Sequence, residues 1–83
     1  MDERARQMHL LAGKEYGREA TCRNGKKINY RTEEAAVQAA DAMTQKHGRP
    51  LEGYPCYWCD GWHVGRKMTS EEVAKFEKLA SIV

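Results

Sequence analysis

The chain lacks any long apolar run, and no stretch of its 83 residues approaches the roughly 18 apolar residues of a membrane span. No apolar signal region opens it. We therefore expect a soluble protein of the cytoplasm (the bacterial host cell, if a phage encodes it) with no membrane partner. In that reducing compartment cysteine thiols stay available as ligands.

The sequence also lacks the residue sets that carry common chemistry. It contains no Ser/His/Asp arrangement and no glycine-rich loop that could cradle a phosphate. It has no internal repeat, no low-complexity tract and no long linker. We therefore predict a single domain over residues 1–83 that is not an enzyme and takes no small-molecule substrate.

Apolar material for a core is scarce as well. Hydrophobic residues make up 41% of the chain, and many of them are alanines, which bury little area. Chains of this size usually need a metal, disulfides or a partner to stay folded. The cysteine count is three, which fits a disulfide framework poorly and a Cys3His metal site well.

The residues for such a site are present. Cys56 and Cys59 stand three positions apart, His63 follows four residues later, and Cys22 lies far upstream. Thiolates and imidazole are the preferred ligands of zinc in closed tetrahedral sites. We predict one structural zinc ion held by Cys22, Cys56, Cys59 and His63.

Alternatives to this ligand set remain open. Cys22 can be a small buried thiol, and His63 can be a strand histidine with a hydrogen-bonded ring. His47 is the substitute ligand. A redox dithiol at Cys56 and Cys59 is disfavoured, because strand-like residues follow the pair where a helix N-terminus would lower the pKa of the first thiol.

In the N-terminal third, the sequence pattern predicts a helix over residues 2–12 that ends at Gly13, followed by a connector over 14–20. Residues 21–30 predict a hairpin, because Asn24-Gly25 is a strong turn signal between strand-like runs. In that hairpin Ile28 would point to a buried face.

The remaining two thirds predict a helix, a hairpin and a helix. Thr32 caps a helix over 33–47 that ends at Gly48, and strands at 51–57 and 61–66 carry the Cys-x-x-Cys loop at their tip. Thr69 and Glu72 form a capping box for a helix over 68–83. Expected core faces are Ala36, Val37, Ala40 and Met43 on the first of these helices, and Val73, Phe76, Leu79 or Ala80, and Val83 on the second.

These elements indicate an α+β fold: a small zinc-stabilised domain in which two short β-hairpins pack on a central helix, with additional N- and C-terminal helices. Residues 1–20 form the N-terminal helix and connector, 21–66 the zinc core, and 68–83 the C-terminal helix.

Positive charge gathers near the cysteines. Residues 14–31 hold six Lys or Arg against two acidic residues, whereas residues 32–45 hold three acidic residues and no basic one. Such residues attract phosphates, and exposed aromatic rings can stack on unpaired bases or anchor a protein partner. The candidate partner- or nucleic-acid-binding residues are Arg23, Lys26, Lys27, Arg31, Arg49, Tyr57, Trp58, Arg66 and Lys67.

Three parts of the chain carry a resemblance. Cys22, the run Lys27-Ile28-Asn29-Tyr30 leading into an Ala-rich helix, and Cys56–His63 together resemble small zinc-finger-like proteins of actinobacteria and their phages. The resemblance covers about residues 22–65 and leaves both terminal helices unmatched. It implies zinc on the same four residues and a phage or prophage origin, but names no role.

Together these features predict a non-catalytic, zinc-stabilised binding module. We expect a phage-type regulator that binds and modulates a host protein or a protein–nucleic-acid machine. A zinc finger that binds DNA or RNA directly through the basic surface is the alternative, and a thiol redox protein is the third class. On the first helix, Met8, Leu10 and Leu11 are candidate exposed contacts for a partner.

Overall fold

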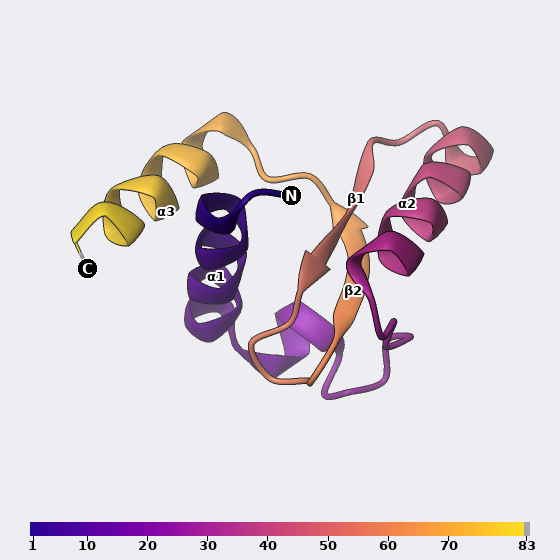
Figure 1. The fold of residues 1–83 in the computed structure, drawn as a ribbon, viewed down its shortest axis with the longest axis horizontal. Helices are drawn as coiled ribbons and strands as arrows, with labels where there is room; N and C mark the ends of the chain where they lie inside the picture. Colours follow the sequence, from indigo (N-terminus) through magenta and orange to yellow (C-terminus); the bar gives the residue numbers. More distant parts are fainter. Residues whose placement is uncertain (83) are drawn as a thin grey trace.

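The computed structural model describes residues 1–82 and, over that range, contains three helices and one two-stranded antiparallel hairpin. The elements are α1 (Glu3–Cys22), α2 (Glu33–His47), β1 (Leu51–Pro55), β2 (Trp62–Arg66) and α3 (Ser70–Ile82). The hairpin lies between α1 and α2, and α3 packs on the outer side of α1 (Figure 1). The α+β class is therefore confirmed.

Helix α1 is longer than the predicted helix over 2–12. Asp2 caps it by accepting a hydrogen bond from the Ala5 N–H at 2.8 Å. Gly13 does not end it, and the expected connector is helical up to Cys22 except for a kink at Gly17, where φ is 88°. Gly13 is instead a point of close approach, because a Cβ there would lie 3.2 Å from Thr21 Cγ2. The prediction of a stop at Gly13 was wrong.

The predicted hairpin over 21–30 was also wrong. Cys22 is helical, and Arg23, Asn24 and Gly25 all have positive φ, at 52°, 57° and 84°. A two-residue hairpin turn uses at most two left-handed residues, so a run of three wraps the chain around Cys22 rather than reversing a strand. Over the described range, this segment joins the sheet through the bridge between Tyr30 and Trp62. Ile28 is 66% exposed, contrary to its expected buried position.

The second predicted hairpin is confirmed. Strands β1 and β2 pair from Leu51 opposite Arg66 to Pro55 opposite Trp62, with the cysteine loop at their tip. One sheet face packs on α2 at very short range: a Cβ on Gly53 would lie 2.9 Å from that of Ala36.

Helix α2 has the predicted bounds, with Thr32 accepting from the Ala35 N–H and Gly48 in the left-handed conformation. Ala36 and Ala40 are buried as expected, and Met43 is half-buried. Val37 is exposed, so its assignment to the core face was wrong.

Helix α1 covers the opposite sheet face. His9 stacks on Tyr54 with ring centroids 5.6 Å apart, and its Nε2 lies 3.1 Å from Glu52 Oε1. The Tyr54 hydroxyl donates to the Thr21 carbonyl at 2.6 Å. The contacts of His9 hold the N-terminal half of α1 against β1, and the bond to Thr21 holds its C-terminal end, so that Cys22 lies near the sheet.

Helix α3 contributes Phe76, which is fully buried against Met8 and Ala12 of α1. Val73 is exposed, so its assignment to the apolar stripe was wrong. Of the alternatives Leu79 and Ala80, Leu79 is exposed and Ala80 packs against the cluster. Val83 lies outside the described residues. Met8 is buried and Leu11 packs against this cluster, so neither is an exposed partner contact; Leu10 is half-buried.

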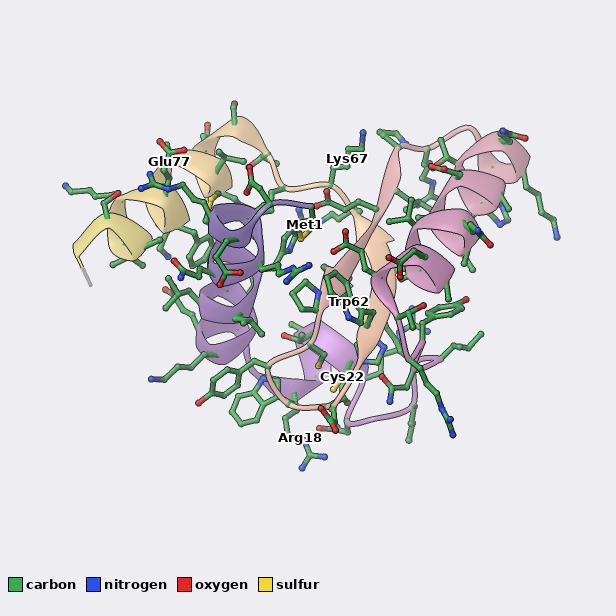
Figure 2. All side chains as sticks on the ribbon, viewed as in Figure 1. Met1, Arg18, Cys22, Trp62, Lys67 and Glu77 are labelled. Atoms are coloured by element: carbon green, nitrogen blue, oxygen red, sulfur yellow. The ribbon has the colours of Figure 1, made fainter. Side chains whose placement is uncertain are left out.

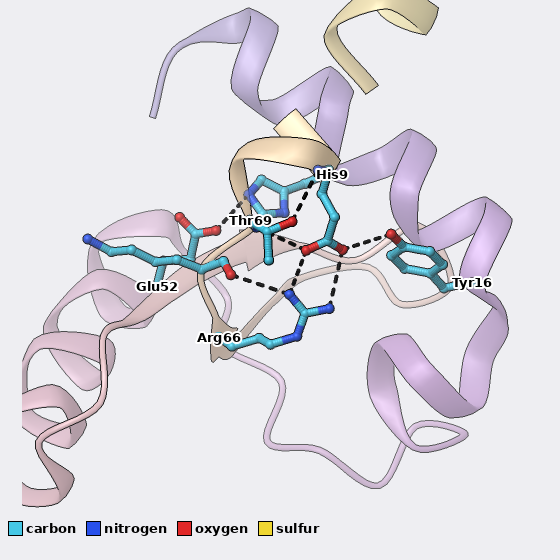
Figure 3. A network of polar contacts seen from close by, with 7 residues as sticks. His9, Tyr16, Glu52, Arg66 and Thr69 are labelled. Carbon is cyan, nitrogen blue, oxygen red and sulfur yellow. Dashed lines mark hydrogen bonds and ion pairs between the residues drawn. The ribbon is translucent and has the colours of Figure 1, made fainter. Parts of the chain in front are cut away.

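The capping box is confirmed and belongs to a larger polar network (Figure 3). Glu72 accepts hydrogen bonds from both terminal nitrogens of Arg66, from the Thr69 N–H and from the Tyr16 hydroxyl. The network joins α3, β2 and α1. None of the helices within residues 1–82 is long and apolar enough to cross a membrane.

Candidate metal centre

The four residues of the predicted ligand set lie together although they come from three parts of the chain. Cys22 is the last residue of α1, Cys56 directly follows β1, Cys59 lies in the tip loop, and His63 is the second residue of β2. Their ligand atoms all lie within 4.8 Å of one another. Ligand atoms of a tetrahedral zinc site are about 3.5–4 Å apart, so small side-chain movements would close this group around one ion.

His63 provides the test of fit. Its ring is fully buried, and Nδ1 lies 2.7 Å from the Ile28 carbonyl oxygen. A carbonyl can only accept, so Nδ1 carries a proton, and in the neutral imidazole Nε2 then has a free lone pair. Among the described residues Nε2 is a buried nitrogen without a hydrogen-bond partner. Such an atom is costly unless something binds it, and a metal ion is the partner that three neighbouring sulfurs would share.

The surroundings of Cys22 and Cys59 shift the pKa values of their thiols in opposite directions. Burial acts to raise the pKa of Cys22, but hydrogen bonds from the Gly25 N–H and from the thiols of Cys59 and Cys56 outweigh it and lower that pKa. Burial and hydrogen bonds to Cys22 and Cys56 raise the pKa of Cys59 to about 11. Three thiolates this close would repel one another, so full deprotonation requires a cation among them.

The turn after α1 supports Cys22. The Gly25 N–H donates to Cys22 Sγ at 3.3 Å, and the N–H groups of Gly25 and Lys27 both donate to the Cys22 carbonyl. Three consecutive residues of positive φ make this wrapping possible. Asn24-Gly25 does form a turn, as the sequence indicated, but this turn surrounds the Cys22 sulfur and does not connect two strands of a hairpin.

The tip loop is fixed at both of its ends. The Cys56 N–H donates to the Gly61 carbonyl at 3.0 Å. Gly61 has no room for a side chain, because a Cβ there would lie 2.7 Å from the Tyr30 carbonyl oxygen. Trp58 Nε1 donates to the Gly13 carbonyl at 2.8 Å, which ties the loop to α1. The need for glycine at 61 was not foreseen, because the segment it meets is distant in sequence.

The substitute ligand lies elsewhere. His47 is exposed at the end of α2 and does not belong to the cluster. Of the two histidines considered, His63 is therefore the one beside the three thiols. The cluster could hold one metal ion such as zinc.

The predicted binding surface divides into two parts. Tyr57 and Trp58 are exposed on the tip loop, where their rings meet edge to face at 4.9 Å beside α1. Most of the basic candidates lie away from this pair. Figure 2 shows Cys22 and Lys67 near opposite ends of the hairpin.

The basic candidates differ in how they are placed. Lys27 turns inward, where Nζ donates to the Tyr54 hydroxyl at 3.0 Å and to the Val64 carbonyl at 3.1 Å. Burial, together with the nearby Arg23, lowers the pKa of Lys27. Arg66 pairs with Glu72 at 2.6 Å. Exposed on the surface are Arg23, Lys26, Arg31, Arg49, Arg66 and Lys67.

Comparison with known proteins does not place the chain. No protein-family model matches it, and no curated protein or solved structure matches it significantly. Its function therefore has to be argued from the site and the surfaces around it.

Proposed function

We propose that this chain is a non-catalytic binding module whose fold is held by one structural zinc ion. The observation that carries the proposal is the buried Nε2 of His63, a lone pair without a partner beside the three cysteine sulfurs. Four protein ligands fill a tetrahedral zinc shell and leave no position for water or substrate. A catalytic role for the ion would need such a position.

The site supports a structural role in a second way. It joins the end of α1 to both ends of the tip loop. Few other buried apolar side chains in the described residues connect these segments, because the apolar cluster of Met8, Ala12 and Phe76 lies between α1 and α3. Binding of a structural zinc ion contributes of order 10–16 kcal/mol in small metal-binding peptides. An ion here would hold α1 and the hairpin in one arrangement.

We further propose a regulatory role, in which the module binds a host protein or a protein–nucleic-acid machine. The resemblance of Cys22 and of Cys56–His63 to zinc-finger-like proteins of actinobacteria and their phages implies a phage or prophage origin, for which a host component is the expected partner. The exposed rings of Tyr57 and Trp58 support binding to a protein, because exposed aromatics are frequent anchors of protein interfaces.

Metal analysis of purified protein, combined with circular dichroism before and after a strong chelator, tests the foundation. We expect about one zinc per chain and loss of ordered structure on chelation, with recovery on adding zinc back. His63→Ala should lower the zinc content well below that of the wild type, whereas His47→Ala, the matched control, should not. A metal-free chain that keeps its fold would refute the proposal.

Direct binding of DNA or RNA is a second candidate function. It is favoured by one observation: five basic side chains line a single surface groove, and no acidic residue in the described part of the chain lines it with them. Binding of this kind must weaken steeply as salt rises. Lack of binding to a single strand or a duplex at low salt would exclude this candidate.

A further inference from the structure

The groove with the basic lining lies beside β2 and is also lined by Met43 of α2 and Leu51 of β1, and we call it the edge groove. Its lining comes from three segments, within residues 23–30, 43–51 and 64–67, and its volume is about 610 Å³. The basic residues of the lining are Arg23, Lys27, Arg49, Arg66 and Lys67. Glu72 neutralises Arg66, but the other four basic residues still give the edge groove an excess of positive charge.

The main chain of β2 directs hydrogen-bonding groups toward this groove. The N–H and C=O of Trp62 bond to Tyr30, on the side away from β1, both at 2.8 Å. Main-chain groups of a strand alternate in direction, so those of Val64 and Arg66 also point away from β1. The segment before α2 lies beside the beginning of β2 (Figure 1), and it bridges the sheet at Tyr30.

One of these groups is already used. The Val64 carbonyl accepts from Lys27 Nζ at 3.1 Å. The Val64 N–H and both main-chain groups of Arg66 are directed at the groove. An exposed strand edge of this kind is a template for pairing with another extended chain.

The floor of the edge groove is apolar. Ile28 lies in it with 66% of its surface exposed, which is the largest exposure among the large hydrophobic residues of the described chain. Leu51, Val64 and Met43 are half-buried beside it. An occupant that bears apolar side chains as well as negative charge would cover this floor.

We propose that the edge groove binds an extended acidic segment of a partner protein, which adds to β2 as a further strand. The proposal deepens the binding function proposed above and rests on it. Basic residues on the rim would pair with Asp or Glu of the partner, while its intervening apolar side chains cover Ile28 and Val64. Residues 64–66 are the last three residues of β2 and correspond to about 10 Å of strand, enough to pair with a segment of about three residues.

The observations favour a peptide over a nucleic acid. Stacking on unpaired bases needs exposed aromatic rings along the basic track. The exposed pair Tyr57 and Trp58 lies on the tip loop and does not line the groove. The tyrosine that does line it, Tyr30, is half-buried and fixed by its bridge to Trp62. Main-chain donors and an apolar floor suit a strand better than a phosphate backbone.

The test uses the zinc-loaded 83-residue chain and fluorescence anisotropy with labelled peptides of about eight residues, the length of a typical strand with short flanks. The first peptide alternates Val with Asp or Glu, the second alternates Val with Lys, and the third is the acidic peptide with N-methyl groups on all of its residues, so that neither edge can donate. We expect micromolar binding of the first and at least about tenfold weaker binding of the others. The N-methyl peptide keeps the charge but blocks strand pairing.

Variants locate the binding. The double variant Arg49→Glu/Lys67→Glu should weaken the acidic peptide at least about tenfold, because it reverses two charges of the rim. Lys78→Glu, an exposed change on α3 away from the groove, is the matched control and should bind like the wild type. Circular dichroism and zinc content of each variant show that it is folded.

Three results would overturn this inference. One is no acidic-peptide binding at millimolar concentration, another is equal binding of the N-methyl peptide, and the third is tighter binding of an oligonucleotide. In each case the zinc content and fold of the same sample report separately on the proposed function. A folded, zinc-loaded protein that does not bind the acidic peptide would refute the strand-addition site without contradicting the proposed zinc module.

Discussion

At the scale of single residues, the carboxylate of Glu72 connects several elements of the fold. It caps α3 and receives hydrogen bonds from Arg66 and Tyr16, so it joins three elements. The Arg66 guanidinium, followed by the Thr69 N–H and the Tyr16 hydroxyl, lowers the pKa of Glu72 to about 2. The sequence identified Glu72 as a cap, but its other two partners come from distant positions that no local pattern connects.

The pH dependence of Glu72→Gln follows from that shift. The ordinary glutamate pKa, about 4.3, applies in the unfolded chain, so the folded state favours the ionised form. Its stabilisation is complete above about pH 4.3 and is lost as the pH falls toward 2. At pH 7 we expect Glu72→Gln to lower the free energy of unfolding by about 1 kcal/mol.

Urea unfolding of both proteins at several pH values measures this difference. It should stay constant between pH 7 and 5 and shrink below about pH 4.3. Loss of a bound metal on acidification affects both proteins alike and cancels in the difference. Glu71→Gln, on the exposed neighbour, is the control and should change little. A difference that grows on acidification would contradict the assignment.

At the scale of secondary-structure elements, local signals fixed α2 and the second hairpin but not the first third of the chain. Thr32, Gly48 and the Thr69–Glu72 pair act within one turn of their own helix, so sequence alone located them. Gly13 and Gly17 carry the same local stop signal, yet α1 continues through both with a kink at the second. Gly13 instead allows close packing, because Thr21 and Tyr57 lie against the position that a Cβ would take.

The contact between α2 and the sheet gives a prediction at this scale. A Cβ on Gly53 would lie 2.9 Å from the Cβ of Ala36, and about as close to the Ala36 and Val37 backbone, at 3.1 and 3.2 Å. Gly53→Ala must push α2 away, which should lower the free energy of unfolding by about 1–3 kcal/mol in urea.

The double variant Gly53→Ala/Ala36→Gly is the matched control for this clash. It should recover only part of the loss, because the backbone atoms stay close and glycine weakens a helix by about 1 kcal/mol. Wild-type stability of Gly53→Ala alone would contradict the close contact between α2 and the hairpin.

At the scale of the whole molecule, two separate clusters of buried side chains connect the elements of the fold. Phe76, Met8 and Ala12 form an apolar cluster between α3 and α1. Cys22, Cys56 and His63 form a buried polar cluster between α1 and the hairpin. The first is an ordinary small core, whereas the second is costly without a shared ion. We therefore expect the two to respond differently to mutation.

Phe76→Ala and Cys22→Ser separate the two clusters. Phe76→Ala should cost about 3–5 kcal/mol through the cavity it leaves, a large part of a small domain's stability, yet leave about one zinc per chain in excess metal. Cys22→Ser should lower the zinc content itself. Thermal melts with metal analysis at low temperature measure both effects. Loss of zinc in Phe76→Ala would show that the clusters form only together.

The sequence by itself determined the ligand types, the helix caps, the Ala-rich face of α2 and the hairpin that carries Cys56 and His63. These follow from spacing, capping and turn chemistry within a few residues. Only the tertiary structure decided that α1 reaches Cys22, that His63 has a buried lone pair facing three thiols, and that Ile28 lies exposed in the edge groove. Each of those depends on residues more than twenty positions apart, whose contacts are set by packing and buried hydrogen bonds rather than by local preference.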